Sequence, residues 1–488
     1  MNLLTALLLL TLPIGLMACG DDSTTEDDGG GGDGDGDTGD GDGDTGDGDG
    51  DTGDGDGDTG DGDTGDGDGD TGDGDGDTGD GDGDTMAACD LSGDGKDVEE
   101  LEGDLGDRTL TSDKVYQLKG TVYVEDGATV EIEPCTRIEG LPLSGDTPAG
   151  TLVVSRGGKL MAEGAPDEPI LFTSSLPAGA REAGTWGGLI LLGKAPNFKG
   201  TDTLIEGLAD EDRNKYGGDV EDDDSGSLAY IRIEFGGFEL NEGNEINGLT
   251  MGGVGSGTSI HHIMVNTTLD DCFEFFGGNV DADHLICNNG GDDMFDADQG
   301  YKGTLSYLIG RMNETSSSDP NGFEMDSDND STDEPRTHVT AENVTLCGQT
   351  DETDDTETSR GMVLRENLTG AFDNIMVTGF DVGVDTRDDF GTEADPNVTM
   401  ANSQFWGQRT ADVGAEETGD DNNDMDFDED MWFEMGDGNS IPETAPYSVD
   451  DCQDADGPNA TVTDSDSGAF VAGSDWNLDG MWVNWEIE

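Results

Sequence analysis

The feature that most constrains the fold of this chain is a repeat of 22 residues in its central part. His262-Ile263-Met264-Val265 aligns with His284-Leu285-Ile286-Cys287 at that offset, and so do Asp270-Asp271 with Asp292-Asp293, and Phe273-Glu274 with Phe295-Asp296. A period of about 20 to 50 residues is typical of solenoids, in which each unit buries its apolar face only against its neighbours. The repeat therefore predicts stacked coils in which matching positions form columns.

Short β-rich runs surround the repeat, at 304–309, 339–346, 372–377 and 398–406. Upstream, residues 122–134 alternate apolar and polar side chains on either side of a turn centred on Gly127. Helical periodicity is almost absent, and strands of about five residues are the usual length. We therefore predict an all-β chain that forms a single parallel β-helix.

The N-terminus carries an apolar run from Leu3 to Leu16, followed by Met17-Ala18-Cys19. This pattern resembles a bacterial lipoprotein signal, which implies that residues 1–18 are removed and that Cys19 is lipidated. An uncleaved anchor or an ordinary signal peptide is the alternative, although the run is shorter than the roughly 20 apolar residues of a spanning helix. The resemblance implies a lipid-anchored protein of the bacterial outer membrane or cell surface.

Every residue from Gly29 to Thr85 is Gly, Asp or Thr. Such a segment has no apolar surface to bury and cannot offset the entropy lost on ordering. We expect residues 19–85 to be a disordered tether that holds a folded domain away from the membrane. Repeated calcium sites along the tether are disfavoured, because the Asp-Gly runs lack the bidentate Glu of such loops.

The net charge of the chain is −95, and 28 acidic residues lie between Asp21 and Asp84. The remainder, residues 86–488, is therefore itself strongly acidic, at about −67. Nucleic acids and anionic lipid headgroups both need a basic surface, so the sequence excludes nucleic acid as a partner. Divalent cations are compatible with this charge.

Six cysteines remain in addition to Cys19, an even number that suggests disulfides in an exported protein. Six cysteines permit 15 pairings. We expect the pairs to be Cys89 with Cys135, Cys272 with Cys287, and Cys347 with Cys452.

Three segments carry a resemblance to a known family: Trp186-Gly187-Gly188-Leu189-Ile190-Leu191-Leu192-Gly193-Lys194-Ala195-Pro196, Glu245-Ile246-Asn247-Gly248-Leu249-Thr250 and Phe273-Glu274-Phe275-Phe276-Gly277-Gly278. From about Thr109 to the C-terminus, the chain resembles right-handed β-helix proteins secreted by bacteria, in particular a largely uncharacterised family of surface lipoproteins. The resemblance implies a fold and a location but brings no catalytic residues. Cys135 stands where similar proteins have Gly, which supports a local disulfide there.

The expected domains are a β-helix over residues 86–410, an acidic insertion loop over 411–440 and a C-terminal capping segment over 441–488. Within the β-helix, residues 197–227 are polar and acidic and are expected to form a long, solvated excursion. Trp482, Val483 and Trp485 suggest a closing strand near the end of the chain.

The repeat also predicts columns of carboxylates on successive coils, which lie about 4.8 Å apart. The candidate metal ligands are Asp270, Asp271, Glu274, Asp292, Asp293, Asp296, Glu324 and Asp326. Carboxylates this close raise one another's pKa unless a cation intervenes, and calcium takes six to eight oxygen ligands. The alternative is that these residues occupy turns for backbone reasons and remain hydrated.

We expect a binding or structural protein of the cell envelope, whose partners are the membrane, through its lipid, and an extracellular polysaccharide or another surface protein. The alternative is a polysaccharide hydrolase or a calcium-dependent lyase. Asp270-Asp271 resembles the acid pair of polygalacturonase-type hydrolases, and Lys302, Arg311, Arg365 and Arg387 are candidate bases of a lyase. His261 and His262, adjacent on a predicted strand, should point to opposite faces and so not share a metal.

Overall fold

The computed structural model describes residues 88–241, 244–312, 320–327, 334–349, 358–388, 390–414 and 427–486. Residues 1–18, Cys19 and the tether of residues 19–85 lie outside the described residues. No helix among the described residues is long and apolar enough to cross a membrane.

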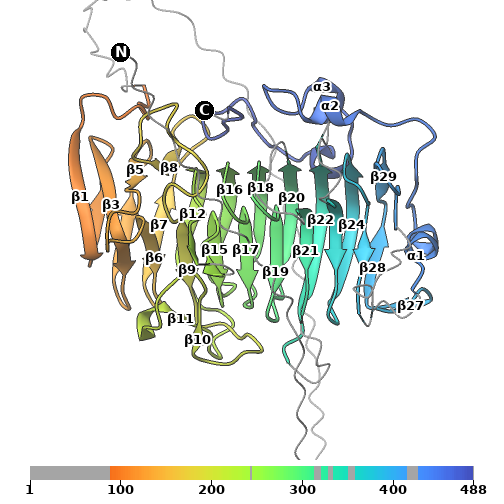
Figure 1. The fold of residues 1–488 in the computed structure, drawn as a ribbon, viewed down its shortest axis with the longest axis horizontal. Coiled ribbons are helices and arrows are strands. Elements are labelled where there is room, and N and C mark those ends of the chain that lie inside the picture. Colours follow the sequence, from red (N-terminus) through yellow and green to blue (C-terminus); the bar gives the residue numbers. More distant parts are fainter. Residues whose placement is uncertain are drawn as a thin grey trace, which may run out of the picture. The chain divides into compact units, whose positions relative to one another are not determined.

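The described part is a parallel β-helix in which 23 strands form one continuous ladder of parallel pairs (Figure 1). Several long strands turn a corner and contribute to two faces of the coil, among them β3 (Lys114–Val124), β12 (Gly226–Glu234), β16 (Ser259–Asn266), β18 (Ala282–Asn288), β20 (Thr304–Arg311), β22 (His338–Cys347) and β24 (Thr369–Thr378). The fold class expected from the repeat is thus confirmed as a parallel β-helix.

The shorter strands complete three faces. The first face includes β2 (Arg108–Leu110), β4 (Thr129–Ile132), β7 (Lys159–Glu163) and β28 (Val398–Ala401). The second includes β1 (Asp97–Asp104), β5 (Arg137–Gly140), β8 (Ile170–Ser174) and β29 (Gln404–Trp406). The third face consists of the end of β3 with β6 (Thr151–Val154), β9 (Leu189–Leu192), β15 (Leu249–Gly252), β17 (Phe273–Phe276), β19 (Phe295–Asp298), β21 (Asn321–Met325), β23 (Arg360–Leu364) and β25 (Asp385–Thr386).

Small elements decorate this coil. Three antiparallel pairs are β10 (Thr203–Leu204) with β11 (Lys215–Tyr216), β13 (Glu239–Asn241) with β14 (Asn244–Glu245), and β26 (Gly391–Thr392) with β27 (Asp395–Pro396). The described helices are short: α1 (Glu429–Met435), α2 (Val449–Cys452), α3 (Ala460–Thr463), and the 3₁₀ turns η1 (Asp212–Asn214) and η2 (Gly468–Phe470).

Columns of apolar side chains fill the interior, because every second residue of each strand points inward. On the third face, Phe273 stacks on Phe295 with ring centroids 5.3 Å apart, and Phe323 packs edge-on against Phe295 at 5.8 Å. All three side chains are fully buried. This aromatic column fixes the register of the strands that carry the acidic residues between them.

Replacement of the central ring in this column, Phe295→Ala, is expected to lower the free energy of unfolding by about 3 to 5 kcal/mol, because the lost transfer energy and the new cavity add together. Chemical denaturation followed by circular dichroism measures this loss. Val98→Ala, at an exposed side chain of β1, is the control and should change stability by less than about 0.5 kcal/mol. Equal losses in both variants would contradict the stacked core.

A column of residues with left-handed backbone marks the corner between the first and second faces. Tyr230, His262, His284 and Tyr307 have φ of 52°, 54°, 53° and 57°, and we call these four residues the corner column. The left-handed residue breaks the strand alternation, so His261 and His262 do not point to opposite faces: their Nδ1 atoms are 3.0 Å apart. The sequence prediction on this point was wrong because it assumed a regular strand.

Residues 197–227 were expected to be a solvated excursion with little to bury, and this expectation was also wrong. Ile205, Leu208 and Tyr216 are buried in a cluster against outward side chains of the third face, among them Tyr123 and Ile190. These three apolar residues are separated by polar ones, so the average composition of the segment does not reveal that it docks on the coil.

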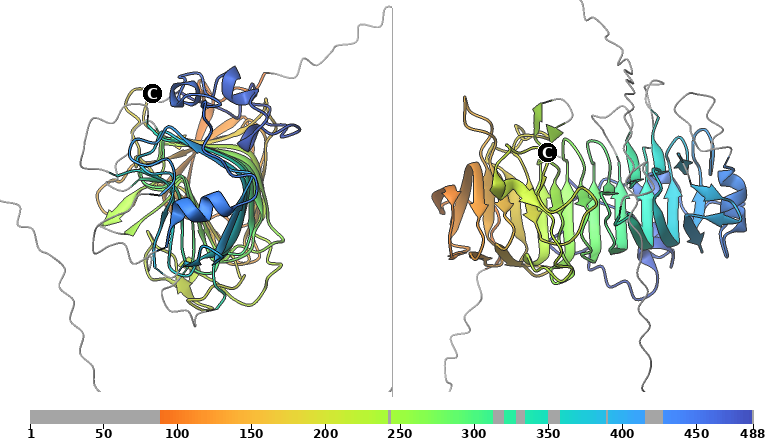
Figure 2. Two further views of the ribbon diagram at one scale, coloured as in Figure 1. Left: turned by 90° about the vertical axis from the view of Figure 1, so that its right-hand side faces the viewer. Right: turned by 90° about the horizontal axis from the view of Figure 1, so that it is seen from below.

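The acidic segment 411–440 ends in α1, which lies across the last coil in the end-on view of Figure 2. Trp432 and Phe433 of α1 join the main core, and Trp432 Nε1 donates to the carbonyl of Val398 at 3.0 Å. Residues 415–426 lie outside the described residues. The apolar anchor therefore covers the end of the β-helix, as an end cap must.

Residues 447–486, which we call the C-terminal strap, run back along the side of the coil from β29 toward β12 (Figure 1). The strap does not add the expected closing strand, because Trp482 and Val483 lie in a turn. Instead, Trp476 and Trp482 are buried against outward apolar side chains of the second face, including Met264 and Ile286. The strap thus covers a flank of the coil.

Disulfides join Cys89 to Cys135, Cys272 to Cys287 and Cys347 to Cys452, the three pairs expected from the sequence. The first ties the start of the described chain to the coil, and the third ties α2 of the strap to β22. Crosslinks that close long loops restrict the unfolded chain most, so the bond at sequence separation 105 secures the strap.

Candidate functional site

The third face carries a column of outward carboxylates at its centre. Glu274 of β17 pairs in register with Asp296 of β19, and Asp296 pairs with Glu324 of β21. Their neighbours along each strand point into the aromatic core, so these three side chains must point out. The structure therefore brings together the column that the repeat predicts.

A second column lies at the turn before these strands. The amide of Asp293 donates to Asp271 Oδ1 at 2.8 Å, and the amide of Asp271 donates to Asn247 Oδ1 at 3.2 Å. Asp271 and Asp293 are only 5% and 3% exposed. These two carboxylates accept hydrogen bonds from backbone amides of the next coil, which is the backbone role of the alternative interpretation, but they are buried and not hydrated.

Both columns open onto one pocket of about 250 Å³ on the third face. It is lined by Glu206, Glu245, Asp270, Asp271, Glu274, Phe276, Asp292, Asp293, Asp296, Asp298, Glu324, Asp326 and Arg365. We call the carboxylic residues of this set the acidic ladder. It includes all eight metal-ligand candidates from the sequence, brought together by three successive coils.

Three members of the acidic ladder were missed by sequence reasoning: Glu206, Glu245 and Asp298. Asp298 lies two residues after Asp296 on β19, hence on the same face, and this spacing could have revealed it. Glu206 comes from the excursion, beside the buried Ile205. Asn247 Nδ2 donates both to Glu206 Oε1 at 3.2 Å and to Glu274 Oε2 at 2.8 Å, and so holds the excursion over the ladder.

The pocket holds eleven carboxylic acids and one basic residue, Arg365, among the described residues that line it. Arg365 Nη2 lies 3.0 Å from Asp326 and also pairs with Glu324. One guanidinium cannot neutralise so many carboxylates, so most of the negative charge in the pocket is uncompensated by the protein.

This imbalance raises the pKa of the carboxyl groups. Burial raises the pKa of Glu206 to about 7 and that of Asp270 to about 8, and the negative charges of Glu245 and other neighbours add to both shifts. Burial, followed by repulsion from like charges, also raises the pKa of Asp271, Glu274, Asp293, Asp296 and Asp326 well above the ordinary range. At neutral pH the ladder must therefore hold either protons or cations.

The donor set fits a hard divalent cation. Three overlapping groups each place three carboxylate oxygens within 4.8 Å of one another: Asp270, Asp271 and Asp292; Asp271, Glu274 and Asp296; Asp293, Asp296 and Glu324. Oxygens on opposite sides of a calcium ion are separated by about 4.8 Å, twice the Ca–O distance. Each group can therefore supply three of the six to eight oxygen ligands of one calcium ion.

Two buried oxygens at the ladder have no hydrogen-bond partner in the described structure. One is Asp296 Oδ1, at the centre of the carboxylate column. The other is the hydroxyl of Thr250, which is 1% exposed and pairs in register with Glu274 on the neighbouring strand. A buried polar atom without a partner costs stability, and a cation bound in the pocket would supply the partner of Asp296 Oδ1.

Of the four candidate lyase bases, only Arg365 lines the pocket. Burial lowers the pKa of Arg365, but the negative charges of Glu324 and Asp326 raise it by a larger amount, so the net shift is upward. The guanidinium therefore stays protonated while it is paired with them. Arg311 lies under the strap against the ring of Trp485, and Arg387 pairs with Asp385 at 2.9 Å. The site as it stands favours holding ions over abstracting protons.

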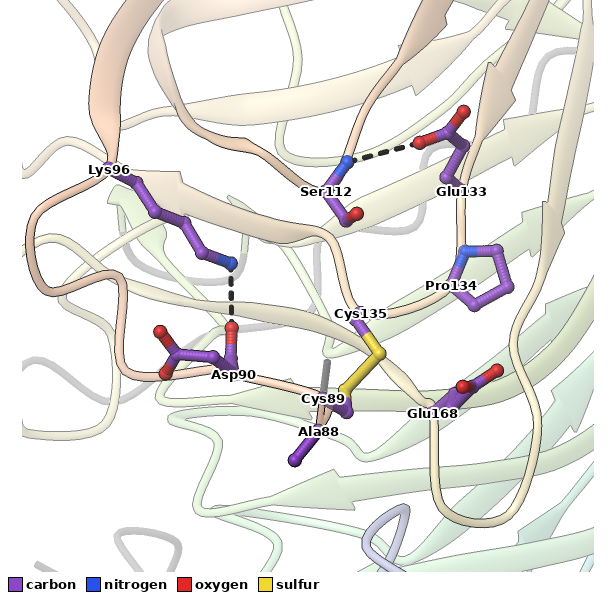
Figure 3. A pocket seen from close by; sticks show the side chains of 9 residues that line it. All are labelled: Ala88, Cys89, Asp90, Lys96, Ser112, Glu133, Pro134, Cys135 and Glu168. Carbon is purple, nitrogen blue, oxygen red and sulfur yellow. Dashed lines mark hydrogen bonds between the residues drawn. A yellow bond between two sulfur atoms is a disulfide. The ribbon is translucent and has the colours of Figure 1, made fainter. Parts of the chain in front are cut away.

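A second hollow of about 710 Å³ surrounds the Cys89–Cys135 disulfide at the start of the coil (Figure 3). Lys96 Nζ donates to the carbonyl of Asp90 at 2.7 Å there, and the amide of Ser112 donates to Glu133 at 3.2 Å. These groups bond to each other across the surface, and none of the described residues that line the hollow belongs to a group that could hold a metal ion. The acidic ladder is therefore the better candidate site.

Comparison with known proteins gives one family. Residues 103–446 match the pectate-lyase-like β-helix domain family. No curated protein matches the chain significantly. Among solved structures, the Dettilon tailspike protein (gp208) is similar to 62% of this chain, with 8% sequence identity and a TM-score of 0.28. The similar region covers 48% of the tailspike, so the chain spans about half of its length.

Proposed function

The chain belongs to the pectate-lyase-like β-helix domain family, and from this premise we propose that it is a calcium-binding surface protein that recognises extracellular polysaccharide. A lipid on Cys19 would hold it at the bacterial outer membrane or cell surface. One observation carries the proposal: eleven carboxylic acids share a pocket with a single arginine. Calcium would neutralise this pocket and fill its oxygen-ligand groups.

Calcium also explains how so acidic a domain could bind an acidic glycan. With a charge of about −67 on residues 86–488, the surface repels anionic polymers. A calcium ion that keeps open coordination positions can accept carboxylates from both partners. The pocket of about 250 Å³ is too small to enclose a polymer, so contact would occur through ions exposed along the third face.

The calcium proposal is tested by titration calorimetry of the full chain with calcium after chelation. We expect saturable binding that is lost when Glu274, Asp296 and Glu324 are replaced together by Gln, Asn and Gln. A glycan array probed with and without calcium then tests recognition, and binding to uronate-containing glycans only with calcium is expected. Calcium binding without binding to any glycan would support a structural role for the ion and contradict recognition.

The lipid anchor rests on the sequence Leu16-Met17-Ala18-Cys19. Metabolic labelling of the full chain with a tagged fatty acid in a bacterial host tests it. Label is expected in the wild-type chain and not in Cys19→Ser. Equal labelling of the two proteins would contradict lipidation at this residue.

A lyase is the second candidate, because the family is pectate-lyase-like and Arg365 lies in the pocket. A cation taken up by Glu324 and Asp326 would draw both carboxylates away from Arg365 and lower the pKa of its guanidinium. The assay is ultraviolet detection of unsaturated uronate in the presence of calcium. Product that disappears in Arg365→Gln would favour a lyase, whereas glycan binding without product favours the binding protein.

A further inference from the structure

Three of the four histidines of this chain lie in the corner column or beside it, and none of the three lines the pocket of the acidic ladder. The chain has four histidines, and His261, His262 and His284 lie at one corner of the coil. The rings of His262 and His284 stack with centroids 4.2 Å apart and planes 8° from parallel. The 22-residue repeat places these two residues in one column, and their ring nitrogens face polar groups that packing of the rings does not require.

His284 is surrounded by hydrogen-bond acceptors. Its Nε2 lies 2.5 Å from the carbonyl oxygen of Ser474 in the strap, and its Nδ1 lies 2.5 Å from Asp283 Oδ1. A neutral imidazole carries hydrogen on only one nitrogen. When Nε2 donates to the carbonyl, the lone pair of Nδ1 faces a carboxylate oxygen, an arrangement that needs either a second proton or a metal ion.

His262 repeats this arrangement one coil earlier. It hydrogen-bonds to the backbone of Asp475, the strap residue next to Ser474, and its Nδ1 lies 3.0 Å from His261 Nδ1. Burial, followed by the charges of His284 and His261, lowers the pKa of His262. Metal-binding histidines commonly donate their other N–H to a carbonyl or carboxylate.

The ligand atoms of His262, Asp283 and His284 all lie within 4.8 Å of one another. Two ligands of one tetrahedral zinc are about 3.3 Å apart, from Zn–N distances near 2.0 Å. Asp283 Oδ1 and His284 Nδ1 already lie 2.5 Å apart. The ring of His262, which is stacked on that of His284, must turn to bring one nitrogen to about 3.3 Å from both atoms, and this would complete three-ligand coordination. We propose that His262, Asp283 and His284 form a site for a zinc-class transition-metal ion, separate from the calcium-type acidic ladder.

The chemistry of the donors separates the two sites. Imidazole nitrogen favours zinc, copper and nickel, whereas a set of carboxylates alone favours calcium and magnesium. The side chain of Asp283 is 45% exposed, which gives an ion a route to the corner column. An ion here would clamp β16 to β18 and fix the rings that bond to Ser474 and Asp475, and so would strengthen the attachment of the strap.

The test is calorimetric titration of the full chain with zinc in the presence of saturating calcium, which occupies the acidic ladder. One zinc site is expected in the wild type, with the dissociation constant raised at least about tenfold in Asp283→Asn and in His262→Gln. His338→Gln, at the remaining histidine on β22, is the matched control and should bind as the wild type does. Cobalt in place of zinc should give the visible absorption of a low-symmetry site in the wild type alone.

A second measurement needs no variant. Zinc is expected to protect His262 and His284, but not His338, from carbethoxylation, as read by peptide mass spectrometry. Absence of zinc binding to the wild type would overturn the proposal, and so would unchanged binding in folded Asp283→Asn and His262→Gln chains. Loss of zinc binding in Glu274→Gln with retention in Asp283→Asn would place the ion on the acidic ladder instead.

Discussion

In calcium-free solution, the free energy of unfolding is expected to fall as pH rises from about 5 to about 8, and calcium is expected to reverse this loss. The carboxyl groups of the acidic ladder have folded-state pKa values above their unfolded values, about 7 for Glu206 and about 8 for Asp270. A carboxyl with a raised pKa contributes stability that is present below its unfolded pKa and is lost as pH rises through its folded pKa.

The size of the effect follows from these shifts. One pKa unit corresponds to about 1.4 kcal/mol, so Glu206 alone accounts for a loss on the order of 3 kcal/mol. For a domain of about 400 residues, this lowers the melting temperature by at least about 3 °C. At pH 8, calcium should restore more than it does at pH 5, because protons compete with the metal for the same carboxylates.

Thermal unfolding of the full chain at pH 5, 6.5 and 8, with chelator or with calcium, measures both trends. Groups such as Glu234 have a lowered pKa, because the charge and hydrogen bond of Arg232 outweigh the effect of its burial, and their stability is lost only below about pH 4.5. They therefore do not act in the chosen window. His262, with a pKa lowered to about 4, adds stability as pH rises toward 6.5 and partly offsets the loss there, so the interval from pH 6.5 to 8 reports the acidic ladder most directly. Magnesium is the control ion, and it is expected to raise the melting temperature less than calcium does, because it requires octahedral geometry that this flexible set of carboxylates fits less well. A calcium-free melting temperature that rises between pH 5 and 8 would contradict the acidic ladder as described.

The sequence was most informative where the repeat is strict. The 22-residue offset predicts the pairing of Glu274 with Asp296 and the stacking of His262 on His284, because a parallel coil places residues one period apart in contact. Asp296 and Glu324 are separated by 28 residues, since a longer turn intervenes, and the strands still align. Strand register survives insertions because the aromatic core column sets it.

Sequence reasoning failed where contacts come from outside the repeat. Glu206 reaches the ladder only because Ile205 docks on the third face, and nothing in the order of residues shows where an excursion lands. The prediction for His261 and His262 failed for a different reason. The left-handed backbone of His262 at the corner turns both side chains to one side, so strand alternation does not apply there. Both errors concern residues that complete a candidate site, and the positions of these residues depend on tertiary contacts and not on strand alternation or composition.

Removal of charge from the acidic ladder should stabilise the calcium-free protein. In the double variant Glu274→Gln and Asp296→Asn, two adjacent buried carboxyl groups become neutral amides of the same shape. Their pKa values are raised by burial and then by each other or by nearby acids, so at pH 8 the wild type must ionise groups that the variant lacks. We expect the variant to melt several degrees above the chelated wild type and to gain nothing from calcium.

The matched control is Glu342→Gln with Asp373→Asn, a pair of carboxylates also in register on neighbouring coils, of β22 and β24, but exposed to water. Solvent screens such a pair, so its loss should change the melting temperature little. The comparison shows whether a pair of carboxylates destabilises the fold because it is buried or only because the two groups are close together. If the ladder variant is less stable than the chelated wild type while the control is unchanged, the carboxylates hold the coil by hydrogen bonds alone, and the fold has no need of an ion. If the ladder variant is more stable than the chelated wild type and no longer responds to calcium, the buried carboxylates destabilise the fold and serve to bind the ion.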